Sequence, residues 1–227
     1  MIRTRILALL LAAVIVAGLA ACSDESSQSP ADTAAAAEAD DSREIPEAVG
    51  RLSKEDEILL NGELKNGVYV NRYFGFKLCV PENGTLIRDN DGAEDTEEMI
   101  SFRQAYEDGW EGIYFTASIE GIDGGIDLYI TALQDDETGL TEKELVEKHI
   151  EDIKKVNRII GDDNEPEYRT IILAGEGHPA AVSIYQDDVG EILSAKVRIP
   201  EGDFEYCITF RGYDGSLEKM AECFEKL

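Results

Sequence analysis

The stretch that decides the fold is residues 168–211, YRTIILAGEGHPAAVSIYQDDVGEILSAKVRIPEGDFEYCITFR. Its apolar and β-branched residues gather in four runs, which predict strands at 168–173, 180–186, 191–199 and 204–211. The connections between the runs are short and rich in Gly, Asp and Glu. Short connections with turn residues join strands that run antiparallel. We therefore predict an antiparallel sheet in this half of the chain.

Two further pairs of strands are predicted upstream. Residues 67–73 alternate between apolar and polar, and residues 76–80 place Phe76, Leu78 and Val80 on one face of a second strand. Residues 113–119 and 126–133 predict a hairpin across a Gly-rich connection.

Three segments predict helices. Thr141 and Glu144 form a capping box, and the helix that follows carries an apolar stripe at helical spacing: Leu145, Val146, Ile150, Ile153 and Val156. Shorter helices are predicted at 95–106 and 217–227. Because strands and helices are segregated rather than strictly alternating, the pattern indicates one α+β domain over residues 60–227. In it an antiparallel β-sheet is covered by helices.

The first 21 residues have the pattern of a signal peptide. Arg3 and Arg5 precede an apolar run from 6 to 21, which is too short for a comfortable membrane span and ends in Leu-Ala-Ala-Cys at Cys22. This tetrapeptide resembles the bacterial lipobox, which implies cleavage after Ala21 and lipidation of the Cys22 sulfur. Two acyl chains suffice for stable anchoring. We expect the chain on the extracytoplasmic face of the membrane; an uncleaved anchor helix or a plain secretory signal would also export the domain.

The processed chain is strongly acidic. Loss of Arg3 and Arg5 reduces the 21 basic residues to 19, against 48 acidic residues, for a formal net charge of −29. Phosphate binding needs clusters of Lys and Arg, and anionic headgroups repel an acidic surface. We therefore expect no nucleic-acid partner, and we expect the lipid on Cys22 to be the contact with the membrane.

Residues 22–58 are predicted to be the lipidated cysteine followed by an acidic flexible linker. The segment is rich in Ser, Ala, Asp and Glu and has no apolar periodicity, so it cannot bury enough surface to order itself. Within it, Ser53 is placed to cap a short helix.

One short motif resembles a known family. Residues 70–84, VNRYFGFKLCVPENG, resemble the Y-x-N-x-x-F-G-F-x-x-x-x-P-E-G opening of many small lipoproteins of clostridia and their relatives. The closing strand and helix fit the same family, which is similar in fold to PsbP, an extrinsic subunit of photosystem II. The resemblance implies a PsbP-like sandwich and an extracytoplasmic location. It implies little about activity, because the motif residues have the character of hairpin and core residues.

The folded part contains three cysteines, Cys79, Cys207 and Cys223, and no Cys-x-x-Cys pair, which excludes a zinc ribbon and a thioredoxin-like motif. One disulfide can form by any of three pairings. Cys207–Cys223 is our first choice, because the last strand and the last helix should pack together. Three reduced thiols are the alternative.

Few residues are candidates for ligand contact or catalysis. His178 lies in a predicted turn, Gly-Glu-Gly-His-Pro, and Trp110 lies in a predicted loop, so both are candidate ligand contacts. His149 borders the apolar stripe of the central helix. The sequence has no Gly-x-Ser-x-Gly elbow, His-Glu-x-x-His motif or Walker loop. We therefore predict no catalytic residue and no cofactor.

Acidic clusters at turns are weak candidates for a calcium site, with Asp89, Asp91 and Asp95 as the strongest set. Calcium prefers six to eight oxygen ligands. The cluster departs from the EF-hand order, because Gly92 stands at the fourth position from Asp89 and not at the sixth.

These observations favour a monomeric, non-catalytic binding or accessory module of unknown ligand, tethered outside the membrane, with an envelope protein or cell-wall component as partner. Two other hypotheses stay open: a hydrolase-type enzyme whose site the known motifs do not cover, and a calcium-responsive surface protein.

Overall fold

The structure is a computed structural model that describes residues 45–80, 84–88, 93–94, 101–119, 124–186, 190–213 and 215–227. In chain order its elements are α1 (Glu47–Gly50), α2 (Lys54–Asn61), β1 (Glu63–Lys65), β2 (Val68–Asn71), β3 (Phe76–Cys79), β4 (Gly84–Arg88), β5 (Ala93–Glu94), α3 (Phe102–Glu107), β6 (Ile113–Ile119), β7 (Gly124–Ala132), α4 (Glu142–Ile160), β8 (Glu167–Leu173), β9 (Glu176–Gln186), β10 (Glu191–Glu201), β11 (Phe204–Tyr213), α5 (Ser216–Ala221) and β12 (Phe224–Lys226).

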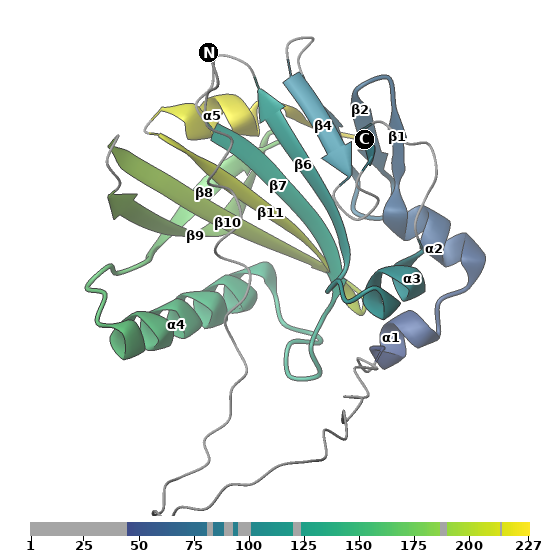
Figure 1. Ribbon diagram of the computed structural model, residues 1–227, viewed down its shortest axis with the longest axis horizontal. Helices are drawn as coiled ribbons and strands as arrows, with labels where there is room; N and C mark the ends of the chain where they lie inside the picture. Colours follow the sequence, from purple (N-terminus) through teal and green to yellow (C-terminus); the bar gives the residue numbers. More distant parts are fainter. Residues whose placement is uncertain are drawn as a thin grey trace, which may run out of the picture. The chain divides into compact units, whose positions relative to one another are not determined.

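The larger sheet is antiparallel throughout, in the order β5-β4-β6-β7-β11-β10-β9-β8 (Figure 1). The four strands predicted between 168 and 211 are β8 to β11, and each pairs with the next in sequence. The β8–β9 turn is tighter than predicted. It consists of Ala174 and Gly175, with φ values of 52° and 85°, and two successive positive φ values are typical of a two-residue type I′ turn. His178 and Pro179 consequently lie in β9, so their predicted position in a turn is wrong.

The smaller sheet has the order β1-β2-β3-β12, and its last strand corrects a prediction. Residues 217–227 were expected to form one helix. The helix α5 ends at Ala221, and β12 then pairs antiparallel with β3, with Phe224 opposite Leu78. The spacing of Leu217, Ala221 and Phe224 fits a helical stripe, but the free edge of β3 offers backbone hydrogen bonds that favour a strand.

The core lies between the two sheets. Aromatic side chains of the smaller sheet and of its β2–β3 turn contact those of the larger sheet. Tyr69 of β2 lies 4.5 Å from Phe115 between ring centroids, Phe74 of the turn lies 5.2 Å from Tyr206, and Phe224 of β12 lies 5.9 Å from Phe210. These side chains are at most 9% exposed. The two sheets therefore form a sandwich.

Helix α4 covers the other face of the larger sheet along β8, β9 and β10 (Figure 1). Its capping box forms as predicted, with Thr141 Oγ1 accepting from the backbone N–H of Glu144. Val146 and Ile150 pack against Ala181 of β9 in a cluster of their own. The α+β fold with antiparallel sheets and covering helices is thus confirmed. None of the described helices is long and apolar enough to cross a membrane.

The predicted end of the linker is wrong, because residues 45–58 belong to the folded part. Val49 in α1 and Leu60 in α2 are each 1% exposed and share the main core. Ser53 caps α2, as predicted, by accepting from the N–H of Asp56 at 3.1 Å. The polar composition of this segment concealed the few apolar residues that anchor it.

The β2–β3 hairpin is built around Asn71, a residue of the motif at 70–84. Asn71 is fully buried, and its Nδ2 donates to Leu60 O at 2.8 Å and to the Tyr69 hydroxyl at 2.9 Å. Its Oδ1 accepts from the N–H groups of Tyr73 and Phe74 at 3.0 and 3.1 Å. One side chain thus joins the end of α2 to the turn that leads into β3, which explains the motif as a structural feature.

Candidate functional site

Four predicted site residues lie outside the described residues: Cys22 and the candidate calcium ligands Asp89, Asp91 and Asp95. Within the described part of the chain, no group of three or more His, Cys, Asp or Glu side chains is arranged to hold a metal ion.

Trp110 is 37% exposed and contacts other aromatic rings. Its ring lies 5.7 Å from that of Tyr114, which stacks on Tyr129 at 5.2 Å. Lys196 Nζ lies 5.1 Å from the centre of the Tyr129 ring. Burial raises the pKa of Tyr114 and Tyr129 well above 10. Trp110 is therefore the outer member of a packed aromatic row, with part of its indole ring accessible.

His178 is 6% exposed, which leaves little of the ring for a ligand to contact. Its Nδ1 lies 3.0 Å from Glu142 Oε2, and its ring meets Phe76 edge-to-face at 5.8 Å. Its Nε2 has no hydrogen-bond partner among the described residues. The ring therefore ties the start of α4 to the core.

The three cysteines of the described residues are free thiols. Cys207 pairs with Arg198 and Tyr129 across the strands, on the face that α4 covers, and is fully buried. Cys223 precedes β12, on the opposite face of the larger sheet. The preferred pairing Cys207–Cys223 is therefore wrong, because the sheet separates the two sulfur atoms.

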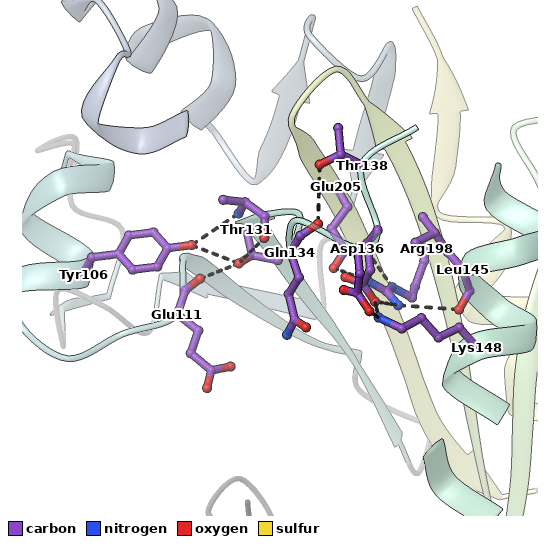
Figure 2. Close-up of polar contacts among 12 residues, drawn as sticks. Tyr106, Glu111, Thr131, Gln134, Asp136, Thr138, Leu145, Lys148, Arg198 and Glu205 are labelled. Atoms are coloured by element: carbon purple, nitrogen blue, oxygen red, sulfur yellow. Dashed lines mark hydrogen bonds and ion pairs between the residues drawn. The ribbon is translucent and has the colours of Figure 1, made fainter. Parts of the chain in front are cut away.

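A buried ion network that the sequence did not reveal lies between α4 and the larger sheet. The Arg198 guanidinium donates to both oxygens of Glu137, at 3.0 and 2.9 Å, and to both oxygens of Glu205, at 2.6 and 2.8 Å. All three residues are at most 7% exposed. Figure 2 shows Arg198, Glu205 and Lys148 converging beside Leu145, whose carbonyl oxygen also accepts from Arg198 at 3.5 Å.

The charges in this network are matched. Burial raises the pKa of Glu137, but Arg198 and Lys148 outweigh that effect and bring it down to about 2. Lys148 Nζ lies 3.1 Å from Glu137 and 3.0 Å from Asp136. Each carboxylate is satisfied by a cation, so no group is poised for proton transfer or for binding a ligand. The network fixes the segment before α4 onto β10 and β11.

A second polar cluster in Figure 2 is also structural. Thr131 donates to Glu111 O, and its hydroxyl lies 3.0 Å from the hydroxyl of Tyr106. Tyr106 in turn accepts from the N–H of Ala132 at 3.2 Å. These bonds hold α3 against the end of β7.

Among the described residues, a groove of about 740 Å³ lies between β8, α5 and β12. Its apolar lining includes Ile172 on β8, Ala174 in the following turn, Leu217 and Ala221 on α5, and Phe224 on β12. Ile172 is 59% exposed although it is apolar. The groove therefore offers apolar surface to solvent beside an edge of each sheet, since β8 and β12 are both terminal strands.

Acidic side chains surround this groove. Glu225 forms an ion pair with Lys77 at 2.7 Å, and Lys226 forms one with Glu176. Glu218 lies on α5 and Glu222 directly follows the helix, four positions further on, and neither side chain has an ion-pair or hydrogen-bond partner among the described residues. The groove thus carries two uncompensated negative charges.

The outer edge of β8 is also unpaired. Its backbone pairs with β9 on one side, and on the other side residues 167–173 make no backbone hydrogen bond within the described part of the chain. The N–H and C=O groups of an edge strand form a template for another strand. The sequence missed this groove, because its walls come from segments about 50 residues apart that meet only in the fold.

Comparisons with known proteins give weak structural similarity only. No family model and no curated protein matches this chain. A crystal structure from Bacteroides thetaiotaomicron VPI-5482 is similar with 12% identity and a TM-score of 0.37, over 74% of this chain and 49% of that one. The alignment thus spans about half of the Bacteroides protein. The solution structure of cyanobacterial PsbP (CyanoP) from Synechocystis sp. PCC 6803 is similar with 10% identity and a TM-score of 0.39, over 70% of this chain and 91% of that one.

Proposed function

We propose that this chain is an exported, lipid-anchored binding module whose binding surface is the groove between β8, α5 and β12. The observation that carries the proposal is that this groove combines an open strand edge, apolar lining and two unpaired carboxylates. In contrast, the buried Arg198 network has matched charges. The lipobox-like end of the apolar run and the motif at 70–84 support a place among the small lipoproteins of clostridia and their relatives.

The proposed ligand is an extended segment of a partner protein in which apolar residues alternate with Lys or Arg. A peptide that joins an exposed sheet edge gains main-chain hydrogen bonds, and pockets for alternate side chains give specificity. Along β8 such a peptide would place apolar side chains on Ile172, Leu217 and Phe224. Its cationic side chains would face Glu218 and Glu222.

The acidity of the whole chain supports a cationic partner as well. A formal net charge of −27 for the full sequence attracts basic segments and speeds their encounter. The Debye length is about 8 Å at physiological ionic strength. Salt largely screens the interaction between exposed charges that are further apart than this. Binding should therefore weaken as salt is raised, while the contribution of the apolar contacts remains.

The groove is tested by charge reversal. A synthetic peptide of alternating Lys and Val should bind the full chain, and Glu218→Lys with Glu222→Lys should weaken that binding about tenfold or more, because two attractions become repulsions. Fluorescence anisotropy of the labelled peptide measures the dissociation constant. The matched control reverses Glu147 and Glu151, which have the same spacing on α4 and give the same change in net charge.

Two outcomes would exclude this groove as a cationic peptide site. One is equal binding of a peptide in which Glu replaces Lys. The other is an equal loss of affinity in the α4 control. A peptide with N-methylated backbone amides should bind less well, because it cannot complete the hydrogen bonds along β8.

The anchor is tested separately. Cys22→Ala removes the sulfur that would carry the lipid, so the protein should either stay unprocessed or appear in the medium. Cell fractionation with an alkaline wash, followed by mass analysis of the N-terminus, distinguishes these forms. Cys79→Ala is the control and should stay on the membrane. A processed Cys22→Ala protein that resists the wash would show that something other than this lipid holds it.

A further inference from the structure

We propose that Cys79 and Cys223 form a disulfide bond that fixes β12 onto β3. The two strands are antiparallel, with Phe224 opposite Leu78 and Glu225 opposite Lys77. Cys223, the turn residue just before β12, comes next to Cys79; its own N–H donates to the carbonyl oxygen of Met220, so the two cysteines share one ladder hydrogen bond and not two. The backbone confirms the juxtaposition, because the N–H of Cys79 donates to the carbonyl oxygen of Cys223 at 2.9 Å.

The geometry suits a covalent bond. Directly opposed residues of a hydrogen-bonded antiparallel pair have Cα atoms about 5.5 Å apart, and disulfides span Cα separations of roughly 4.4–6.8 Å. Side chains of directly opposed residues project on the same face of a sheet. On this face the next pair, Lys77 and Glu225, already forms a contact at 2.7 Å. The thiols of Cys79 and Cys223 also interact electrostatically, because Cys79 is among the groups that raise the pKa of Cys223.

Two contacts must be released. The Cys79 thiol is hydrogen-bonded to the side chain of Glu225. Cys223 Sγ now lies 3.6 Å from the carbonyl oxygen of Lys219, and a thiol is a weak donor. Rotation about the Cα–Cβ bond of Cys223 frees the sulfur to turn toward Cys79. Cys207 does not compete, because it is fully buried on the opposite face of the larger sheet.

The bond forms by exchange with an external disulfide, such as a small-molecule disulfide or an exported oxidoreductase in its disulfide form. The Cys79 thiolate attacks that disulfide and releases one external thiolate. The Cys223 thiolate then attacks the Cys79 sulfur of the mixed disulfide and releases the second. Two cysteine thiols are oxidised, one external disulfide is reduced, and the two protons lost by the cysteines appear on the released thiols.

Cys79 is the natural first nucleophile because it is only partly buried, whereas Cys223 is 8% exposed. Burial raises the pKa of both thiols. Since the thiolate is the reactive form, oxidation should proceed faster as the pH rises from 7 to 9. The bond would fix the strand that bears Phe224 and Glu225, which form one wall of the groove.

Peptide mapping tests the pairing directly. The full chain is incubated with glutathione disulfide at pH 8, its remaining thiols are alkylated, and trypsin then separates the cysteines into peptides 78–88, 199–211 and 220–226. The expected product joins 78–88 to 220–226, two hydrogens lighter than the sum of the two, while 199–211 carries the alkyl group. Alkylation of all three peptides, or a cross-link that includes 199–211, would overturn the proposal.

Variants distinguish the effect of the disulfide bond on Tm from other effects of oxidation. Oxidised wild-type protein should melt about 5–10 °C above reduced protein, because the bond restricts the unfolded chain. Cys79→Ser and Cys223→Ser should lose both the cross-link and the difference in Tm, and Cys207→Ala should keep both. An equal difference in Tm in Cys79→Ser would contradict the proposal.

Discussion

Replacing Arg198 with Met should lower the free energy of unfolding by about 3–5 kcal/mol, because it leaves buried carboxylates without their cation. Arg198 is the shared donor for Glu137 and Glu205, which are 6% and 5% exposed. Methionine fills similar space but cannot compensate either charge. Urea denaturation followed by circular dichroism gives the free energy of unfolding, and the midpoint should fall sharply.

Two further variants test the cause of this loss. Arg169→Met removes an exposed arginine that pairs with Glu167 at 2.9 Å, and it should cost less than about 1 kcal/mol. Combining Arg198→Met with Glu137→Gln and Glu205→Gln should restore much of the stability, because no unpaired buried charge remains. If Arg198→Met costs no more than Arg169→Met, the network contributes little to folding.

Replacing Asn71 with Ala should cost about 3 kcal/mol or more. The change leaves Leu60 O and the N–H groups of Tyr73 and Phe74 without their partner, and buried polar groups left unpaired cost about 1–3 kcal/mol each. The same denaturation experiment measures the effect. Asn66→Gly is the control in the neighbouring β1–β2 turn, where φ is 52° and glycine is tolerated, so stability should change little.

Asn71→Asp separates the role of the donor from that of the acceptor. The carboxylate keeps an oxygen for Tyr73 and Phe74 but directs another at the carbonyl oxygen of Leu60. At neutral pH this variant should be destabilised about as much as Asn71→Ala. Protonation restores a donor, so its deficit relative to wild type should shrink as the pH falls. A deficit that does not change with pH would argue against the proposed donor role.

Features that depend on near neighbours could be predicted from the sequence. The capping box of Thr141 and Glu144 and the cap at Ser53 are confirmed. The four strands between 168 and 211 are also confirmed, with the turn at Ala174 and Gly175 tighter than expected. Capping, apolar periodicity and short turns act over a few residues, so the printed sequence contains all the information that they need.

Features that depend on distant partners could not be predicted. Residues 224–226 form a strand because the edge of β3 is free, and nothing local distinguishes them from the end of a helix. In the sequence, Arg198 has the pattern of a surface residue on an alternating strand. In the structure, α4 covers Arg198 together with Glu137, which is 61 positions away. The sequence predicts His178 in a turn. In the structure the turn before it has only two residues, so β9 begins earlier and includes His178.

The sequence by itself determined the α+β class, the antiparallel order of the last four strands and the expectation of a lipid anchor at Cys22. Only the tertiary structure decided which cysteines are neighbours in the fold, where buried charges are compensated and where the groove lies. The physical reason is register. Which residues of remote strands become neighbours depends on how whole sheets pack, and the packing of the sheets depends on the burial of the entire core.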